Sequence, residues 1–215
     1  MKKIITMSLV LLLVTIITVS GTYAFFTATI GSSNTQFAKS DQLEVIYTGD
    51  TEISGNLNLV TNKNEGFRRQ VSINLTENSI DALANLYIHV DEIDEALATG
   101  ALEWEIYKIN KDNTETVLAT GDFLDCGALN ETKSKCTNGD RIYMISDINL
   151  LTKEELDKIK EEQSITDETE LQALKVQKFA IYIWLNGYEA GNEVLGTSFT
   201  GYIGAETQNI TGDLS

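Results

Sequence analysis

Apolar and polar residues alternate along much of the chain from Gln42 onward. A period of two residues is typical of a β-strand that faces the protein interior on one side and solvent on the other. The apolar members of these runs are Leu57 and Leu59; Val71, Ile73 and Leu75; Leu86, Ile88 and Val90; Leu102, Trp104 and Ile106; and Phe199, Ile203 and Ala205. The pattern predicts a protein built mainly from β-strands.

One later run is apolar on both of its faces, which is typical of a central strand. It alternates Phe179, Ile181, Ile183 and Leu185 with Lys178, Ala180, Tyr182 and Trp184. Turn-forming sequences separate the runs, namely Thr48 to Asp50, Asn64 to Gly66, Lys111 to Asn113 and Thr137 to Asp140. Many short strands at this spacing predict a two-sheet antiparallel sandwich.

A helical segment interrupts the strand pattern between Leu151 and about Gln163. Thr152 and Glu155 have the spacing of a capping box, and Leu151 and Leu156 that of a hydrophobic staple. Further helical turns are predicted from Thr166 to Leu174. We expect residues 151–174 to be a helical insertion between strands, packed on one end of the sandwich. Its expected apolar contacts are Leu156, Ile159, Leu171 and Leu174.

The first 24 residues resemble a secretory signal peptide. Lys2 and Lys3 precede an apolar run from Ile4 to Val19, and small residues favour cleavage between Ala24 and Phe25. Extending the apolar run to Phe26 would instead reach the ~20 residues of a retained membrane anchor. The predicted organisation is a signal peptide at 1–24, an N-terminal mature segment at 25–39 and a sandwich domain at 40–215.

The charge balance limits the possible partners. The chain has 16 basic and 32 acidic residues, a net charge of −16. Removing the leader would leave 14 basic residues against 32 acidic ones, a net charge of −18. Such a surface disfavours a nucleic-acid partner and contact with anionic membranes, apart from an uncleaved leader.

The two cysteines, Cys126 and Cys136, bracket a polar loop. In an exported chain this spacing predicts one disulfide, and two free thiols are the alternative.

Candidate catalytic and metal-ligating residues are few. The single histidine, His89, lies on the polar side of a strand pattern and there is no HExxH sequence. Neither a zinc peptidase nor a serine or cysteine triad is indicated. Acidic neighbours such as Asp91 to Glu95 are common in so acidic a chain, and a calcium loop there is a minor alternative. We therefore expect no enzyme activity, no cofactor and no small-molecule substrate.

The N-terminal region resembles the TasA and camelysin family of exported Gram-positive proteins. The residues that carry the likeness are Gly21 to Thr27, Thr35 to Ala38 and Leu43 to Val45, with a weaker likeness from Phe179 to Thr207. The resemblance implies a leader removed by a SipW-type signal peptidase, a jelly-roll-like sandwich and extracellular biofilm-matrix fibres. Some members are described as metallopeptidases, but this sequence lacks a credible ligand set.

The family also implies that subunits polymerise by donating the N-terminal strand to a neighbouring sheet. Residues 25–38 carry no charge, and Phe26, Ala28 and Ile30 alternate with Thr27 and Thr29. Such a strand can pair with an open sheet edge, in a neighbour or in its own sandwich, without burying charge. Together with the leader and the lack of catalytic residues, the resemblance implies a secreted, non-enzymatic fibre subunit that associates with itself or a related subunit. The alternatives are a membrane-tethered surface domain or adhesin and, less favoured, a secreted peptidase.

Overall fold

The computed structural model describes residues 26–28, 36–40, 43–49, 52–56, 59–60, 62–77, 79–126, 135–187, 190–194 and 196–209. Its strands are β1 (Phe26–Ala28), β2 (Gln36–Ser40), β3 (Leu43–Gly49), β4 (Glu52–Asn56), β5 (Leu59–Val60), β6 (Phe67–Leu75), β7 (Ala82–Ile93), β8 (Leu102–Ile109), β9 (Glu115–Asp122), β10 (Arg141–Leu150), β11 (Gln177–Asn186) and β12 (Ser198–Asn209). Short 3-10 turns η1 (Lys63–Glu65) and η2 (Asn192–Val194) accompany them, with helices α2 (Lys153–Glu162) and α3 (Glu168–Lys175).

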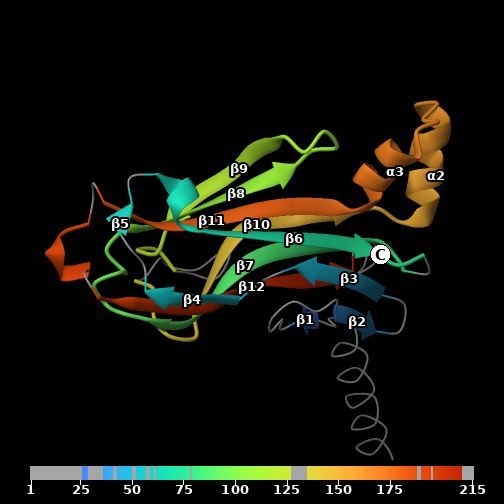
Figure 1. Ribbon diagram of the computed structural model, residues 1–215. Helices are drawn as coiled ribbons and strands as arrows, with labels where there is room; N and C mark the ends of the chain where they lie inside the picture. Colours follow the sequence, from blue (N-terminus) through green and yellow to red (C-terminus); the bar gives the residue numbers. More distant parts are fainter. Residues whose placement is uncertain are drawn as a thin grey trace, which may run out of the picture.

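The strands form two layers (Figure 1). The five-stranded sheet has the order β1-β12-β7-β10, and β4 also pairs with β12. The seven-stranded sheet has the order β2-β3-β6-β11-β8-β9, and the short β5 runs parallel to the end of β11. All other pairs are antiparallel. The predicted mainly β fold, a two-sheet antiparallel sandwich, is confirmed.

The core lies between the sheets, where the inward residues of both layers meet. Val71 and Ile73 of β6 and Leu86 and Ile88 of β7 are 0–1% exposed and belong to one apolar cluster. These are positions at which the period of two predicted an inward side chain. Burial of each such side chain typically contributes about 1.5–3 kcal/mol, so this alternation stabilises the sandwich.

Strand β11 is central, as predicted, because β6 pairs with one of its edges and β8 with the other. Its inward residues, such as Ile181, join the main core. On its outer face, Ala180, Tyr182 and Trp184 form a second, smaller cluster with the partly buried Tyr107 and Ile109. The outer face of this sheet is thus also partly covered.

The helical insertion between β10 and β11 is confirmed. Thr152 caps α2, and the predicted capping box is complete, because Glu155 N donates to the Thr152 hydroxyl and Thr152 N donates to Glu155. Asp167 caps α3 in the same way through its carboxylate. Both helices lie at one end of the sandwich, where Leu156 is buried (Figure 1). No helix in the described ranges has the length and apolar content required to span a membrane.

Two long strands, β9 and β10, have no counterpart among the predicted runs. Ile142 and Met144 are buried in β10, but two shifts of register against β7 interrupt its alternation. Residues 115–118 of β9 are all exposed, so no apolar period marks the strand. The predicted run of Leu57 and Leu59 lies partly outside the described residues. Strand β4 ends before Leu57, and β5 begins at Leu59.

Candidate functional site

The N-terminal strand β1 lies at an edge of the five-stranded sheet. Its residues pair antiparallel with β12, with Phe26 opposite Thr207 and Ala28 opposite Ala205. The same edge of β12 pairs with β4 nearer its start, from Ser198 to Tyr202. Strand β1 therefore pairs with a short stretch of this edge of β12, and β4 pairs with another stretch of the same edge. The predicted cleavage residues Ala24 and Phe25, and the predicted donor residue Ile30, lie outside the described residues.

The part of β12 beside β1 is well buried. Ala205 and Thr207 are 3–4% exposed, and the Thr207 hydroxyl has no hydrogen-bond partner among the described residues. Positions 26 and 28 of β1 are opposite these two residues. The described backbone thus places positions 26 and 28 in register with a buried part of β12, and their role as donor-strand residues stays a prediction.

A second edge, β9, ends the seven-stranded sheet. It pairs with β8 on one side, and no strand pairs with its other side in the described part of the chain. Val117, Leu118 and Leu124 are the large apolar side chains that the described ranges leave exposed, at 52%, 40% and 39%. The pairing with β8 shifts register near Leu118, because an extra residue bulges there. An open edge with exposed apolar side chains is a typical template for another strand.

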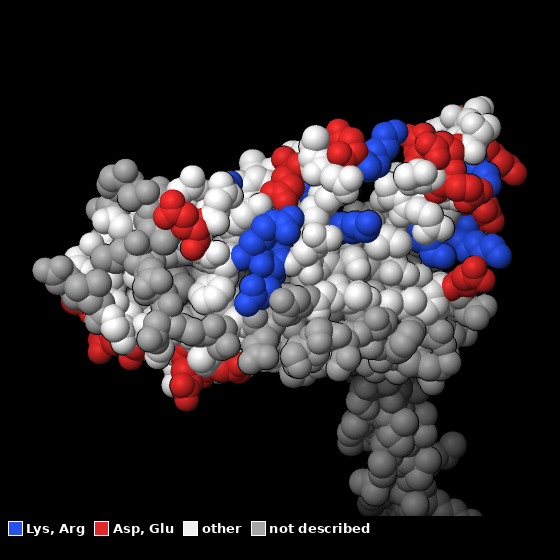
Figure 2. Space-filling view, viewed as in Figure 1, with Lys and Arg blue, Asp and Glu red and all other residues white. Residues whose placement is uncertain are grey.

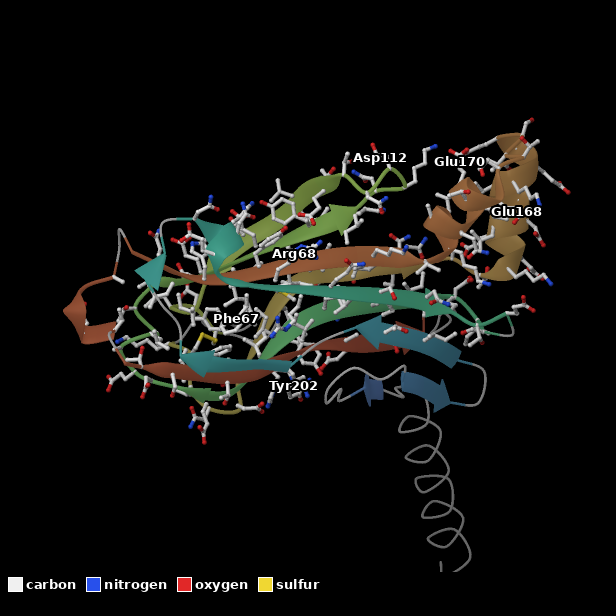
Figure 3. All side chains as sticks on the ribbon, viewed as in Figure 1. Phe67, Arg68, Asp112, Glu168, Glu170 and Tyr202 are labelled. Carbon is white, nitrogen blue, oxygen red and sulfur yellow. A yellow bond between two sulfur atoms is a disulfide. The ribbon has the colours of Figure 1, made fainter. Side chains whose placement is uncertain are left out.

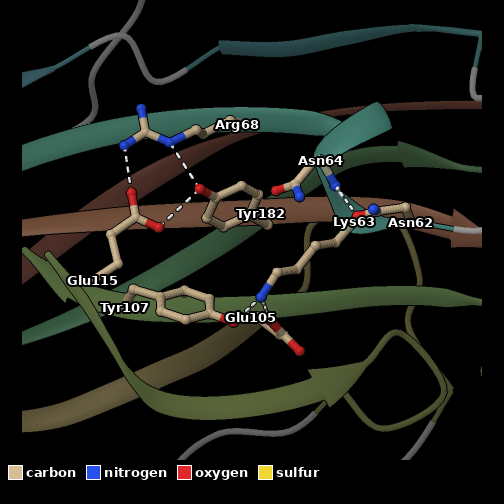
Figure 4. Close-up of polar contacts among 8 residues, drawn as sticks. All are labelled: Asn62, Lys63, Asn64, Arg68, Glu105, Tyr107, Glu115 and Tyr182. Carbon is tan, nitrogen blue, oxygen red and sulfur yellow. Dashed lines mark hydrogen bonds and ion pairs between the residues drawn. The ribbon is translucent and has the colours of Figure 1, made fainter.

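Ion pairs and tyrosines cover the outer face between β6, β11 and β9 (Figure 4). Arg68 Nη2 lies 2.6 Å from Glu115 Oε1, and Arg68 Nε donates to the Tyr182 hydroxyl at 3.0 Å. Tyr182 in turn donates to Glu115 Oε2 at 2.8 Å. Burial opposes the shift, but the hydrogen bonds from Arg68 and Tyr182 hold the pKa of Glu115 below its ordinary value. The three side chains tie β6, β11 and β9 together.

A second ion pair lies beside the first (Figure 4). Lys63 Nζ is 2.6 Å from Glu105 Oε2 and 4.2 Å from the centroid of the Tyr107 ring, and Lys63 also donates to the Tyr107 hydroxyl. Basic side chains gather over the middle of this face, and acidic ones over the helices (Figure 2). Each of these two cations is already paired with a carboxylate, so the arrangement stabilises the sheet surface without a free nucleophile or base.

The outer face of the five-stranded sheet carries another polar cluster. Arg141 forms an ion pair with Glu206, and the Tyr143 hydroxyl lies 3.1 Å from both Glu206 oxygens. Arg141 also lies over the Tyr87 ring, at 4.6 Å from its centroid. A Cβ at Gly204 would collide with that ring, so glycine makes room for it. Burial raises the pKa of Tyr87 well above its ordinary value, which keeps the phenol neutral.

A shallow hollow of about 390 Å³ separates the β8–β9 turn from α3. Lys111 Nζ contacts Glu170 Oε1 at 2.8 Å across it, and Asp112 and Glu170 are near each other in Figure 3. The Asp112 carboxylate accepts hydrogen bonds from Thr114 within the turn. The hollow is open to solvent, and its polar side chains form hydrogen bonds with one another. This arrangement is typical of a contact between two neighbouring secondary-structure elements.

His89 is partly buried, with its side chain 20% exposed. Its Nε2 atom is 3.5 Å from Asp91 Oδ1, and its ring lies 4.8 Å from that of Tyr202. His89 lies on the polar side of β7 as expected, but it is only partly exposed, because Tyr202 lies against its ring and its Nδ1 atom is buried without a hydrogen-bond partner among the described residues. Within the described ranges, no three His, Cys, Asp or Glu side chains come together as a group suited to a metal ion.

Cys126 and Cys136 are joined by a disulfide, with their Cα atoms 4.6 Å apart. Both are 2–3% exposed and belong to the main core. The bridge fixes the end of the segment after β9 to the segment before β10. It is therefore a structural bond within the core of the sandwich.

Sequence reasoning did not find the paired groups of these clusters, because their partners come from distant strands. Arg68, Glu115 and Tyr182 are separated by 47 to 114 positions in the sequence. The available signal was the presence of tyrosine and arginine on the outer face of a strand. Predicting that these side chains contact one another requires knowledge of the strand order in the sheet. The predicted disulfide joins two cysteines that are close along the chain. The donor strand was expected from its own uncharged, alternating sequence and from the family resemblance, whereas its partner strand β12 is distant in the sequence.

No family model and no curated protein matches the chain. Among solved structures, the structure of infectious bursal disease virus Gx strain aligns with 86% of this chain, at 13% identity and a TM-score of 0.25. The chain spans 30% of the length of that viral chain. A similarity of this size carries no argument about fold or function.

Proposed function

We propose that the protein is a secreted, non-enzymatic structural subunit of an extracellular fibre or biofilm matrix, which assembles through its N-terminal strand. The observation that carries the proposal is the position of β1 at the edge of β12, held by three residue pairs. A strand that fits this edge in its own chain fits the same edge of a second copy, because both arrangements use the same hydrogen bonds.

The sequence of the segment supports exchange between copies. Residues 25–38 are uncharged in a chain with net charge −16, so the strand enters another sheet without burying an ion. Gly31 to Asn34 then provide small and polar residues suited to a link between an exchanged strand and its own domain. The likeness of residues 21–45 to exported fibre proteins favours the same role.

The test compares two substitutions at one position of β1. Ala28→Asp introduces a charge opposite Ala205, whereas the matched control Ala28→Val keeps the position apolar. We expect purified exported protein and the Val control to form filaments in the electron microscope. The Asp variant should remain monomeric while its circular dichroism stays that of a folded β-protein.

N-terminal sequencing completes the test, because a fibre subunit processed as proposed begins at Phe25. Filaments formed equally well by the Asp variant would remove the strand-exchange proposal. An exported chain that still begins at Met1 would instead favour the membrane-tethered alternative.

A further inference from the structure

We propose that the open edge of β9 binds an extended segment of a second protein as an added antiparallel strand. The segment has a basic residue at one end, followed by a hydroxyl or amide side chain and then by apolar residues. The groups that select this chemistry are Trp104, Val117, Leu118 and Asp122. The contact lies in the other sheet from the pairing of β1 with β12, so it goes beyond the proposed function and does not depend on strand exchange.

The indole of Trp104 leaves a hydrogen-bond donor unused at this edge. Trp104 of β8 is opposite Gly121 of β9, and its ring belongs to the main core between the sheets. A Cβ at Gly121 would collide with the ring edge that carries Nε1, so the indole lies across the edge strand. Trp104 is 6% exposed, and its Nε1 atom has no hydrogen-bond partner among the described residues. A buried donor without an acceptor is unfavourable, and a strand beside Gly121 can supply the acceptor.

The backbone of β9 is suited to a strand on this side. Phe123 N donates to Leu102 O, so the alternation of an antiparallel ladder directs the backbone groups of Thr120 and Asp122 toward the open edge. A residue of the added strand opposite Gly121 then belongs to a non-hydrogen-bonded pair, in which the two strands approach closely. Directly opposite residues project to the same face of a sheet. A serine, threonine or asparagine at that position therefore brings its side-chain oxygen next to the indole N–H.

The acidic end of β9 selects a basic residue in the partner. Asp122 is opposite Glu103 on the outer face of the sheet, and like charges at such positions repel each other. Asp122 Oδ1 accepts a hydrogen bond from Leu124 N, and Glu103 Oε1 accepts one from Asn186. Among the described residues, neither carboxylate forms an ion pair with a lysine or arginine. A lysine or arginine of the partner opposite Asp122 relieves this repulsion.

The other half of the edge is apolar. Val117 and Leu118 are 52% and 40% exposed, and they lie next to each other at the bulge opposite Tyr107. Apolar residues of the added strand cover these side chains, and burial of this surface stabilises the contact. The backbone hydrogen bonds of an added strand provide affinity, and its side chains provide specificity. The edge thus selects the order basic, hydroxyl or amide, and then apolar.

A second copy of β9 is the wrong occupant for this edge. Strand β9 contains the acids Glu115 and Asp122 and no base. Pairing with β9 of another copy brings such acids together, and each copy has a net charge of −16. Both carboxylate oxygens of Glu115 are held by Arg68 and Tyr182, so Asp122 is the acid of β9 with which a partner can pair. Charge therefore favours a basic segment of a different protein.

Peptide binding followed by nuclear magnetic resonance tests the inference on the exported protein, at concentrations at which it is monomeric. The probe is the acetylated peptide Lys-Thr-Thr-Ser-Val-Val, whose first threonine is opposite Gly121 when its lysine is opposite Asp122. We expect the Trp104 indole N–H signal to move downfield on binding. The amides of Thr120 and Asp122 should exchange with solvent about tenfold more slowly. The Trp184 indole lies in the outer cluster and is the internal control, whose signal should not move.

Matched peptides and protein variants separate the elements of recognition. Replacing the peptide lysine by glutamate should weaken binding about fivefold, and this difference should shrink in the Asp122→Asn variant. Replacing the first threonine by valine should also weaken binding about fivefold, but should have no effect in the Trp104→Phe variant. Circular dichroism shows whether both variants fold. If Trp104→Phe does not fold, the indole signal of the parent chain decides the same point.

Each contrary outcome is specific. The absence of saturable binding, stronger binding of the glutamate peptide, or binding that leaves the Trp104 signal unchanged would overturn the inference. A dimer in sedimentation whose β9 amides are protected without peptide would show that a second copy covers the edge, and would also overturn it. The Ala28→Asp variant should form no filaments and still bind the peptide. The proposed fibre and the β9 contact can therefore fail independently.

Discussion

Strands β11 and β9 belong to one sheet, and both carry apolar side chains, yet they differ in what surrounds them. Strand β11 pairs on both edges, and residues 179–185 are at most 8% exposed. Strand β9 pairs on one edge and leaves Val117 and Leu118 at 52% and 40% exposed. The apolar residues of β11 are buried when the chain folds, and this burial explains why they are apolar. Among the described residues, those of β9 are not buried in this way, and an open edge with exposed apolar side chains is a typical template for another strand.

The largest expected difference between the two strands is the loss of unfolding free energy when an apolar side chain of each is truncated. Phe179→Ala removes a ring that is 2% exposed and should lower the free energy of unfolding by about 3–5 kcal/mol. The matched change in β9, Val117→Ala, should alter it by less than about 0.5 kcal/mol. Urea denaturation followed by tryptophan fluorescence measures both. Equal losses would mean that β9 is as important to the fold as β11.

The disulfide tests how firmly the segment after β9 is fixed. Replacing Cys126 and Cys136 together by serine should lower the free energy of unfolding by roughly 2–3 kcal/mol, because closure of a short loop limits the unfolded chain. Thermal unfolding of the oxidised parent and the double variant gives the difference. A parent chain treated with reductant serves as the control and should match the variant. A change near zero would contradict a structural role for the bond.

The hydrogen bond between Tyr182 of β11 and Glu115 of β9 should contribute less. Tyr182→Phe removes the hydroxyl that bonds Arg68 and Glu115 and should cost about 1 kcal/mol of unfolding free energy. Combining it with Glu115→Gln in a double-mutant cycle measures the coupling between β11 and β9. Additive effects would show that Tyr182 does not connect the two strands.

The smallest expected effect is a dependence of stability on pH. The pKa of Glu115 is lowered in the folded chain, so its contribution is present above the ordinary glutamate pKa of about 4.3 and is lost as the pH falls through the folded value. The pair is partly exposed, which limits the effect to about 1 kcal/mol or less. Unfolding measured between pH 3 and pH 6 should be less pH-dependent in Glu115→Gln. If the unfolding free energy of the variant depends on pH as steeply as that of the parent chain, the Glu115 carboxylate is not the cause of the dependence.

The sequence was informative where neighbours along the chain determine the structure. Alternation predicted the faces of β6, β7 and β8, and the spacing of Thr152 and Glu155 predicted the cap of α2. It did not reveal β9, because exposure on both faces removes the period of two. Contacts such as those between Arg141 and Glu206 depend on the order of β10, β7 and β12, which local patterns do not specify.

The location of β1 in the assembled protein tests the central claim most directly. Electron cryomicroscopy of filaments from the exported protein should show β1 of one subunit beside β12 of its neighbour, with the chain beginning at Phe25. A protein that stays monomeric at all concentrations, or filaments in which every β1 lies beside β12 of its own chain, would contradict the account.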